Sequence, residues 1–266
     1  MTAPTPHKRS FHYLITVFAL TVAIGHSADP GQSLPSPTPS ASSTPSPAVP
    51  SGPPVSTIPS DKNFAHYYVM QATLADHMAA NKPEDIDLIF IGDSITQAWR
   101  WGNGLPVWKR YYEGRAIDFG VSADRTEHVL WRLDNLGIRK FHPKVAVILI
   151  GTNNWDPTYT PEDIAEGVKA VIAKTRECFP GVKILLMSIL PNARATEKMA
   201  TANPLIRNLA DGKEVIYVDL ASKFTPEGEN WKGLLKDKLH LTTEGYEMWA
   251  AEINPLIDQI APKSAK

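Results

Sequence analysis

Short apolar runs alternate with amphipathic stretches over roughly the last two hundred residues of the chain. Five of these runs are rich in Ile, Val and Leu and are mostly continuously apolar: residues 86–91, 116–119, 145–150, 182–190 and 215–220. Continuous apolar runs are typical of parallel strands buried on both faces, whereas strands with one solvated face alternate apolar and polar residues. The pattern therefore predicts a parallel β-sheet.

Helical patterns lie between the predicted strands. The clearest follows Thr160-Pro161, a typical helix start, and its apolar positions recur at helical spacing: Ile164, Val168, Val171 and Ile172. Further helices are expected at about residues 62–80, 124–134, 196–210 and 243–260. Alternation of strands and helices over this length predicts a doubly wound α/β domain with helices on both faces of the sheet.

The first sixty residues have a different composition. Residues 1–28 combine a basic start, an apolar run from about Phe11 to Ile24 and small residues, as in a secretory signal peptide. That run is shorter than the about 20 residues of a membrane span, although an uncleaved anchor is the alternative. Residues 29–60 contain ten of the 23 prolines, and such a segment buries too little apolar surface to fold. We expect a signal peptide (1–28), a disordered linker (29–60) and one domain (61–262) in an exported protein, periplasmic, extracellular or on the cell surface.

Charge and cysteine content narrow the range of functions. The formal net charge is −1 and no run of like charges occurs, which argues against nucleic acid or an anionic membrane as a partner. The single cysteine, Cys178, lies at a predicted helix end with no histidine or basic cluster near it in sequence. A packed structural thiol is therefore expected there rather than a nucleophile.

Polar blocks follow the predicted strands. Ser94 follows the first strand, Gly120 the second and Asn153 the third, whereas Asp237 and His240 lie beyond the fifth. The carboxyl ends of parallel strands meet at one edge of a sheet, where ligands bind in folds of this class. We therefore expect these residues to converge and to supply a nucleophile, oxyanion donors and an acid–base pair for acyl transfer.

The nucleophile and base are assigned from their local sequence. Ser94 in IFIGDSIT stands at a strand-to-helix turn, where a mere helix-capping role is the alternative. Asp237 and His240 are three residues apart in KDKLHLT, so His240 can accept the Ser94 proton while Asp237 orients the imidazole ring. The other histidines of the domain lack such a partner and form no metal-ligand cluster, so no metal site is expected: His66, His77, His128 and His142.

Two candidate oxyanion donors follow the second and third strands. Gly120 in DFGVSADRT has no side chain to shield its amide, although a strand-ending glycine alone is a weak signal. The side-chain amide of Asn153 in LIGTNNW is a neutral donor for a developing oxyanion, with Asn154 as the alternative.

The chain carries, in this order, four blocks that resemble those of the SGNH (GDSL-type) hydrolases: Gly-Asp-Ser, Gly, Gly-Thr-Asn and Asp-x-x-His. The stretches FGVSADRTEHVLWRLDN, VILIGTNN and LHLTTEGY are similar to the catalytic subunits of platelet-activating-factor acetylhydrolase, over about residues 85–262. The resemblance implies a three-layer αβα, flavodoxin-like fold with a five-stranded parallel sheet of order 2-1-3-4-5, and no cofactor. It also implies five site residues: Ser94 as nucleophile and, through its amide, oxyanion donor, His240 as base, Asp237 as its partner, and Gly120 and Asn153 as further oxyanion donors.

The chain departs from these relatives at one point of the site. After Gly120 the relatives carry a Gly-Gly-Asp run, whereas this chain has Val121-Ser122-Ala123-Asp124. We expect a differently shaped cleft. The relatives are also cytosolic, so their substrate is not carried over to a chain with an export signal.

Residues near the catalytic blocks suggest the substrate. Ile95 and Leu239 adjoin the proposed catalytic pair and predict a small acyl pocket that favours acetyl groups, with ordinary packing as the alternative. Four tryptophans lie near the expected rim, where some can stack on sugar rings while at least two belong to the core: Trp99, Trp101, Trp108 and Trp155. An acetyl esterase acting on a small-molecule or polysaccharide ester is the leading hypothesis. A phospholipid or lysophospholipid acyl hydrolase comes second, and a non-catalytic binding module third.

Overall fold

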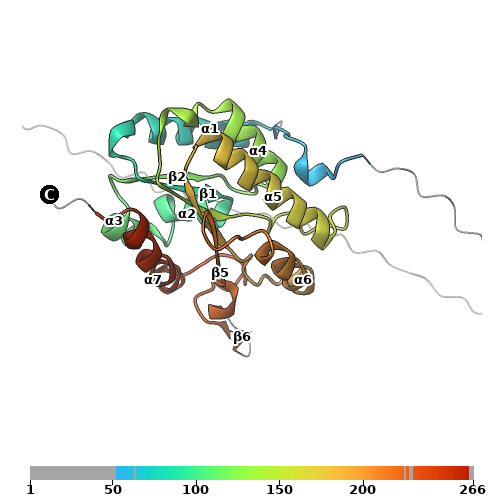
Figure 1. Cartoon of the computed structure of the whole chain (residues 1–266). Coiled ribbons are helices and arrows are strands. Elements are labelled where there is room, and N and C mark those ends of the chain that lie inside the picture. The colour runs from blue at the N-terminus through green and yellow to red at the C-terminus, as the bar shows by residue number, and fades with distance from the viewer. Residues whose placement is uncertain (1–51, 63, 225, 228–229, 264–266) are drawn as a thin grey trace, which may run out of the picture. The chain divides into compact units, whose positions relative to one another are not determined.

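The predicted apolar runs form one five-stranded parallel sheet (Figure 1). The computed structural model describes residues 52–62, 64–224, 226–227 and 230–263, so the predicted signal peptide and most of the predicted linker lie outside the described residues. The strands are β1 (Leu88–Gly92), β2 (Ala116–Gly120), β3 (Val145–Leu149), β4 (Lys183–Met187) and β5 (Val215–Val218). Their order is β2-β1-β3-β4-β5, which confirms the predicted doubly wound α/β fold.

Helices cover both faces of this sheet, and each face has its own apolar core. On one face lie α1 (Ala65–Ala79), α4 (Thr126–Asn135), α5 (Pro161–Cys178) and α6 (Thr196–Arg207). On the other lie α2 (Ser94–Trp101), α3 (Leu105–Tyr111) and α7 (Thr243–Ile260). Successive strand residues alternate between the two cores, as Ile89 and Phe90 do, because side chains of a strand point to opposite faces.

The remaining elements are short. They are the 3₁₀ turns η1 (Val55–Thr57), η2 (Pro83–Asp85), η3 (Ile138–Lys140) and η4 (Ala221–Lys223), and a hairpin of β6 (Pro226–Glu227) and β7 (Asn230–Trp231). The five predicted helices are present, with ends within a few residues of those expected. Helix α3 has only seven residues, too few for a helical period to be read from the sequence. In the ranges described, no helix is long and apolar enough to cross a bilayer.

Residues 55–62, here called the N-terminal strap, pack on the domain although the linker was expected to extend to residue 60. Ser56 is fully buried, and its hydroxyl donates to the Asp163 carbonyl at 2.6 Å. The Thr126 hydroxyl donates to the Ser56 carbonyl at 2.8 Å, and the Ser60 amide donates to the Glu127 carbonyl at 3.1 Å. The folded domain therefore begins before residue 61. Hydrogen bonds to Asp163, Thr126 and Glu127 hold the strap on the domain, and composition does not reveal such contacts.

Gly167 of α5 makes room for the strap. A Cβ atom at this position would lie 2.9 Å from the Ser56 Cβ and too close to the Thr126 hydroxyl. We expect Gly167→Ala to lower the free energy of unfolding by about 1–3 kcal/mol through overpacking, although alanine is the better helix former by about 1 kcal/mol. Thermal unfolding measures this, with Ala173→Gly on the exposed face of α5 as the control for helix propensity alone. A more stable Gly167→Ala protein would contradict the packing of the strap.

Cys178 is a packed thiol, as predicted. It is 6% exposed at the end of α5, and its Sγ donates to the Leu133 carbonyl at 3.6 Å. Burial raises the pKa of this thiol, which disfavours the reactive thiolate at neutral pH.

Candidate active site

The carboxyl end of β1 places Ser94 at the start of α2. Asp93 is the N-cap of this helix, and its Oδ1 accepts a hydrogen bond from the Ile95 amide at 2.9 Å. Gly92 allows β3 and α2 to approach closely, because a Cβ there would collide with the Leu149 carbonyl and the Thr96 hydroxyl. Ser94 thus lies at a helix N-terminus, where free amides favour negative charge.

Ser94, His240 and Asp237 form a continuous hydrogen-bonded chain. Ser94 Oγ lies 2.9 Å from His240 Nε2, and His240 Nδ1 lies 2.7 Å from Asp237 Oδ2. With Nδ1 donating to the carboxylate, Nε2 is the acceptor for the Ser94 hydroxyl. The predicted pairing across 146 residues of sequence is therefore present.

The loop that carries His240 is held by its own hydrogen bonds. Asp237 Oδ1 accepts the backbone amides of Leu239 and His240, both at 3.0 Å, and the Leu235 amide donates to the His240 carbonyl at 2.8 Å. Burial acts to raise the pKa of Asp237, but hydrogen bonds from the His240 side chain and these amides outweigh it and lower the pKa. The carboxylate therefore stays ionised and orients the imidazole ring.

Asn153 and Asn154 have different surroundings. Asn153 Nδ2 donates to the Asp124 carbonyl at 2.9 Å and lies 3.3 Å from Oδ2 of Asp93, the neighbour of Ser94. Asn154 is fully buried, and its Nδ2 donates to Glu127 Oε2 at 3.2 Å. Of the two alternatives, Asn153 contacts Asp93, the residue before Ser94, whereas Asn154 contacts the first turn of α4. Burial raises the pKa of the Asp93 carboxyl to about 7.

The Gly120 amide differs from the sequence expectation. It donates to Asp118 Oδ1 at 2.9 Å, so it is engaged within its own strand rather than free to face a ligand. A Cβ at this position would lie too close to the Gln97 amide. Gly120 thus allows α2 to pack against the end of β2.

Ala123, which the sequence analysis did not single out, precedes Asp124, whose carbonyl accepts the Asn153 side chain. It has a φ of 60°, in the left-handed region, and is exposed in the β2–α4 loop, residues 121–125. This conformation costs an alanine about 1–2 kcal/mol. Its amide has no acceptor within the part of the chain that the structure describes. The sequence signal for this left-handed position was the Gly-Gly-Asp run that the relatives carry here, because glycine marks backbone positions that need a positive φ.

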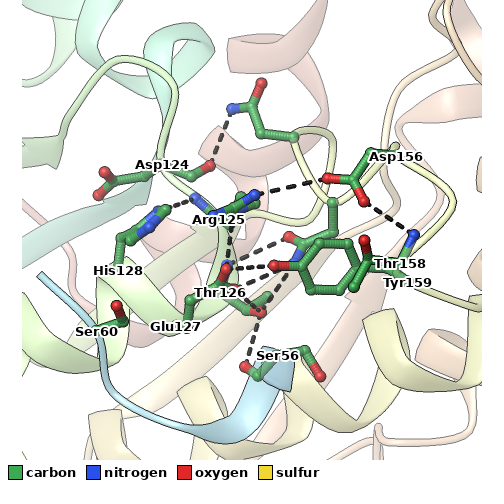
Figure 2. A network of polar contacts seen from close by, with 12 residues as sticks. Ser56, Ser60, Asp124, Arg125, Thr126, Glu127, His128, Asp156, Thr158 and Tyr159 are labelled. Carbon is green, nitrogen blue, oxygen red and sulfur yellow. Dashed lines mark hydrogen bonds and ion pairs between the residues drawn. The ribbon is translucent and has the colours of Figure 1, made fainter. Parts of the chain in front are cut away.

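A buried polar network joins the loops after β2 and β3 (Figure 2). At its centre the Glu127 carboxylate, only 1% exposed, accepts the Tyr159 hydroxyl at 2.6 Å and lies 2.7 Å from Arg125 Nε. Arg125 also reaches Asp156 at 3.6 Å, and Asn154 contacts the same Glu127 carboxylate. Charge-assisted bonds of this kind hold both loops in fixed positions.

The apolar residues next to Ser94 and His240 in the sequence belong to the core. Ile95 is 1% exposed and Leu239 is 5% exposed, so ordinary packing describes both. Of the four tryptophans, two are buried (Trp99 and Trp108) and two are exposed (Trp101 at 55% and Trp155 at 42%). Trp155 follows the Asn153 loop, and the Arg194 guanidinium lies 6.0 Å from the centre of its ring.

A parallel sheet of order 2-1-3-4-5 with Ser94, His240 and Asp237 at its carboxyl edge is the architecture of an α/β ester hydrolase. The chain belongs to the GDSL-like lipase/acylhydrolase family, whose model matches residues 90–248. The protein is thus a carboxylic ester hydrolase, and the resemblance seen in the sequence is confirmed.

Individual proteins are similar to this chain in sequence or in fold. The chain is 30% identical over 176 residues to the alpha1 subunit of platelet-activating factor acetylhydrolase IB from Bos taurus, covering 64% of this chain and 74% of that protein. A GDSL-like lipase from Bacteroides thetaiotaomicron has the same fold, with a TM-score of 0.60, 22% identity, and 71% and 97% coverage. So has a carbohydrate acetylesterase from Sinorhizobium meliloti, with a TM-score of 0.53, 18% identity, and 65% and 99% coverage.

Proposed function

We propose that the protein is an exported serine esterase that removes acetyl or other short acyl groups, with acetylated carbohydrate as the substrate. The observation that carries the proposal is the chain of hydrogen bonds from Ser94 through His240 to Asp237. A helix cap or a binding module needs no such chain, whereas a serine nucleophile needs both the base and its partner.

The geometry supports a two-step acyl transfer. Ser94 Oγ attacks the ester carbonyl carbon as its proton passes to His240 Nε2, and Asp237 stabilises the resulting imidazolium. When the tetrahedral intermediate collapses, the carbon–oxygen bond to the alcohol breaks and His240 returns the proton to the leaving alkoxide. Water then attacks the acyl-enzyme with His240 again as base, which releases the acid and restores Ser94.

The carbonyl oxygen becomes negatively charged in both steps and needs donors. Asn153 Nδ2 is held by its short bond to the Asp124 carbonyl, so its longer contact with Asp93 is the one that an oxyanion would replace. The Ser94 amide opens α2 and is a second donor. Because the Gly120 amide is engaged by Asp118, we assign the third position to the amide of Ala123.

Three observations support an acetylated carbohydrate as the substrate. One relative is an acetylhydrolase, and one structural neighbour is a carbohydrate acetylesterase. Trp155 exposes an aromatic face close in sequence to Asn153, where a sugar ring can stack. The composition of residues 1–28 indicates export. Acyl hydrolysis of a phospholipid or lysophospholipid is the second candidate, and the name of the relative, platelet-activating factor acetylhydrolase, is the observation that favours it.

We expect activity on nitrophenyl esters to fall steeply from acetyl or propionyl to octanoyl. Ile95 and Leu239 are already packed in the core, and the Tyr246 hydroxyl donates to the Ile95 carbonyl at 2.6 Å. An acyl chain that had to extend between Ile95 and Leu239 would displace core side chains, which is costly in a close-packed interior. Measurement of kcat/KM along the ester series tests this. A flat or rising profile would contradict the small pocket and favour a lipid substrate.

The substrate class is tested by acetate release from a panel of acetylated polysaccharides and acetylated phospholipids. Release from polysaccharide alone supports the proposal, and release from phospholipid alone favours the second candidate. Binding of polysaccharide without any release, together with no turnover of nitrophenyl acetate, would point to a non-catalytic binding module.

A further inference from the structure

Lys62, at the end of the N-terminal strap, is a buried lysine that contacts the β2–α4 loop. Only 9% of the residue is exposed. Its Nζ donates to Asp124 Oδ1 at 2.7 Å and to the Ser122 carbonyl at 3.1 Å. It also lies 4.7 Å from the centre of the Tyr67 ring. The two acceptors flank Ala123, so a single ammonium group holds the loop on both sides of its left-handed residue.

The Asp124 carboxylate pairs with a second buried cation besides Lys62. Arg132 already pairs with it, with 2.6 Å between Nε and Oδ2 and with both side chains fully buried. Arg132 also donates to the carbonyls of Phe119 and Gly92, at 2.8 and 3.2 Å, which anchors the base of the loop to the strand ends. Burial lowers the pKa of Lys62, a sign that placing a second cation here costs desolvation energy. Lys62 is thus the second cation on this carboxylate, and it is the cation that also reaches the backbone of the β2–α4 loop, at the Ser122 carbonyl.

The loop that Lys62 holds carries one proposed oxyanion donor and contacts a second. Ala123 presents its amide there, and the carbonyl of Asp124 accepts the Asn153 side chain at 2.9 Å. Ser122 is fixed from the other side, because its amide donates to Gln97 Oε1 at 2.8 Å. A left-handed alanine persists only where the surrounding contacts hold it. Figure 2 shows the adjoining part of this region, where Ser56 and Ser60 of the strap lie close to Thr126 and Glu127.

We propose that Lys62 is a positioning residue for ester hydrolysis: its ammonium group fixes the β2–α4 loop so that the Ala123 amide and the Asn153 side chain meet the carbonyl oxygen under attack. This role rests on the proposed function, because both donors matter only where an oxyanion forms. Lys62 itself touches neither substrate nor reacting atoms. Through Lys62, the N-terminal strap thereby helps to set the catalytic rate.

Lys62→Met in the full chain tests the role. We expect kcat on nitrophenyl acetate to fall about 10- to 100-fold, because a displacement of about 1 Å in a positioned group costs that much. KM should stay within about threefold, since the interaction strengthens only as charge develops on the oxygen. Inactivation of Ser94 by a serine-directed phosphonate should slow by a similar factor, because the phosphoryl oxygen occupies the same position. Lys62→Arg, which keeps the charge, should recover most of the activity.

Lys140→Met is the matched control. Lys140 also donates to a backbone carbonyl, that of Met78 at 3.2 Å, and lies 5.0 Å from the centre of the Phe141 ring. It contacts neither the β2–α4 loop nor the Asn153 loop in any interaction among the described residues. The same chemical change there should leave kcat unchanged. Thermal unfolding and phosphonate titration of reactive Ser94 report how much of each variant is folded.

Two results would overturn the role of Lys62. One is a folded Lys62→Met protein whose kcat is within about twofold of wild type. The other is a loss of kcat no larger than the loss of Ser94 that the phosphonate can titrate, because such a loss means only that fewer molecules are folded. If Lys62→Met does not fold, Lys62→Gln, which can still donate to the Ser122 carbonyl, is judged by the same criteria. Full activity in Ser94→Ala would refute the proposed function itself, whereas an inactive Ser94→Ala beside a fully active Lys62→Met refutes only the role of Lys62.

Discussion

Ser94→Ala is expected to abolish ester hydrolysis, with kcat lower by about 10⁶-fold, as for the loss of a serine nucleophile from a triad. Ser94 Oγ is the only atom of the Ser94–His240–Asp237 chain placed to form the acyl-enzyme. Burst kinetics on nitrophenyl acetate measure the effect. A serine-directed phosphonate should label the wild-type protein at Ser94, as read by peptide mass spectrometry.

The fold should survive the Ser94→Ala change. Ser94 opens α2 after the capping residue Asp93, and its hydroxyl contacts His240, so little packing is lost. Ser188→Ala is a control for which we expect the opposite result. The buried Ser188 hydroxyl accepts a hydrogen bond from the Ala221 amide at 2.7 Å. The substitution should lower stability and leave kcat intact. Phosphonate labelling at another residue, or normal turnover by Ser94→Ala, would remove the proposed mechanism.

Asn153→Ala is expected to lower kcat by about 10²–10³-fold, or roughly 3–4 kcal/mol, with a much smaller effect on KM. The side-chain amide lies beside Asp93 and is held by the Asp124 carbonyl, and its interaction with the carbonyl oxygen strengthens as charge develops. Steady-state kinetics on nitrophenyl acetate, with circular dichroism to establish folding, provide the measurement.

The Asn154→Ala variant distinguishes a side chain that donates to the oxyanion from one that only stabilises the fold. Asn154 is fully buried and bonded to Thr126 and Glu127, so its loss leaves buried polar groups unpaired. We expect a decrease of about 1–3 kcal/mol in the free energy of unfolding and a milder change in kcat. A larger kcat loss in Asn154→Ala than in Asn153→Ala, with both proteins folded, would show that the donor is assigned to the wrong residue.

The layers of the fold could be predicted from the sequence because strand and helix periods are local. Five apolar runs became β1 to β5, and the helix from Pro161 to Cys178 begins where Thr160-Pro161 indicated. The meeting of Ser94 with His240 could also be predicted, since parallel strands end at one edge of the sheet. The helix α3, only seven residues long, offered no period to read.

Other features depend on contacts that no local pattern contains. The Gly120 amide is engaged because the Asp118 side chain turns back toward it, which leaves the left-handed Ala123 as the exposed amide of that loop. Asn153 and Asn154 are adjacent and chemically identical, and only packing against α4 decides which is buried. The strap joins the domain through bonds to residues more than sixty positions away, at Thr126 and Asp163.

The sequence by itself therefore determined the α/β class, the sheet edge that carries the site and the identity of the serine, histidine and aspartate that meet there. These follow from the periodicity of apolar residues and from strand ends. The tertiary structure alone decided which amides of the site are free and that Lys62 reaches the β2–α4 loop. The physical reason is that a backbone donor is free or engaged according to partners brought together only when the whole chain folds.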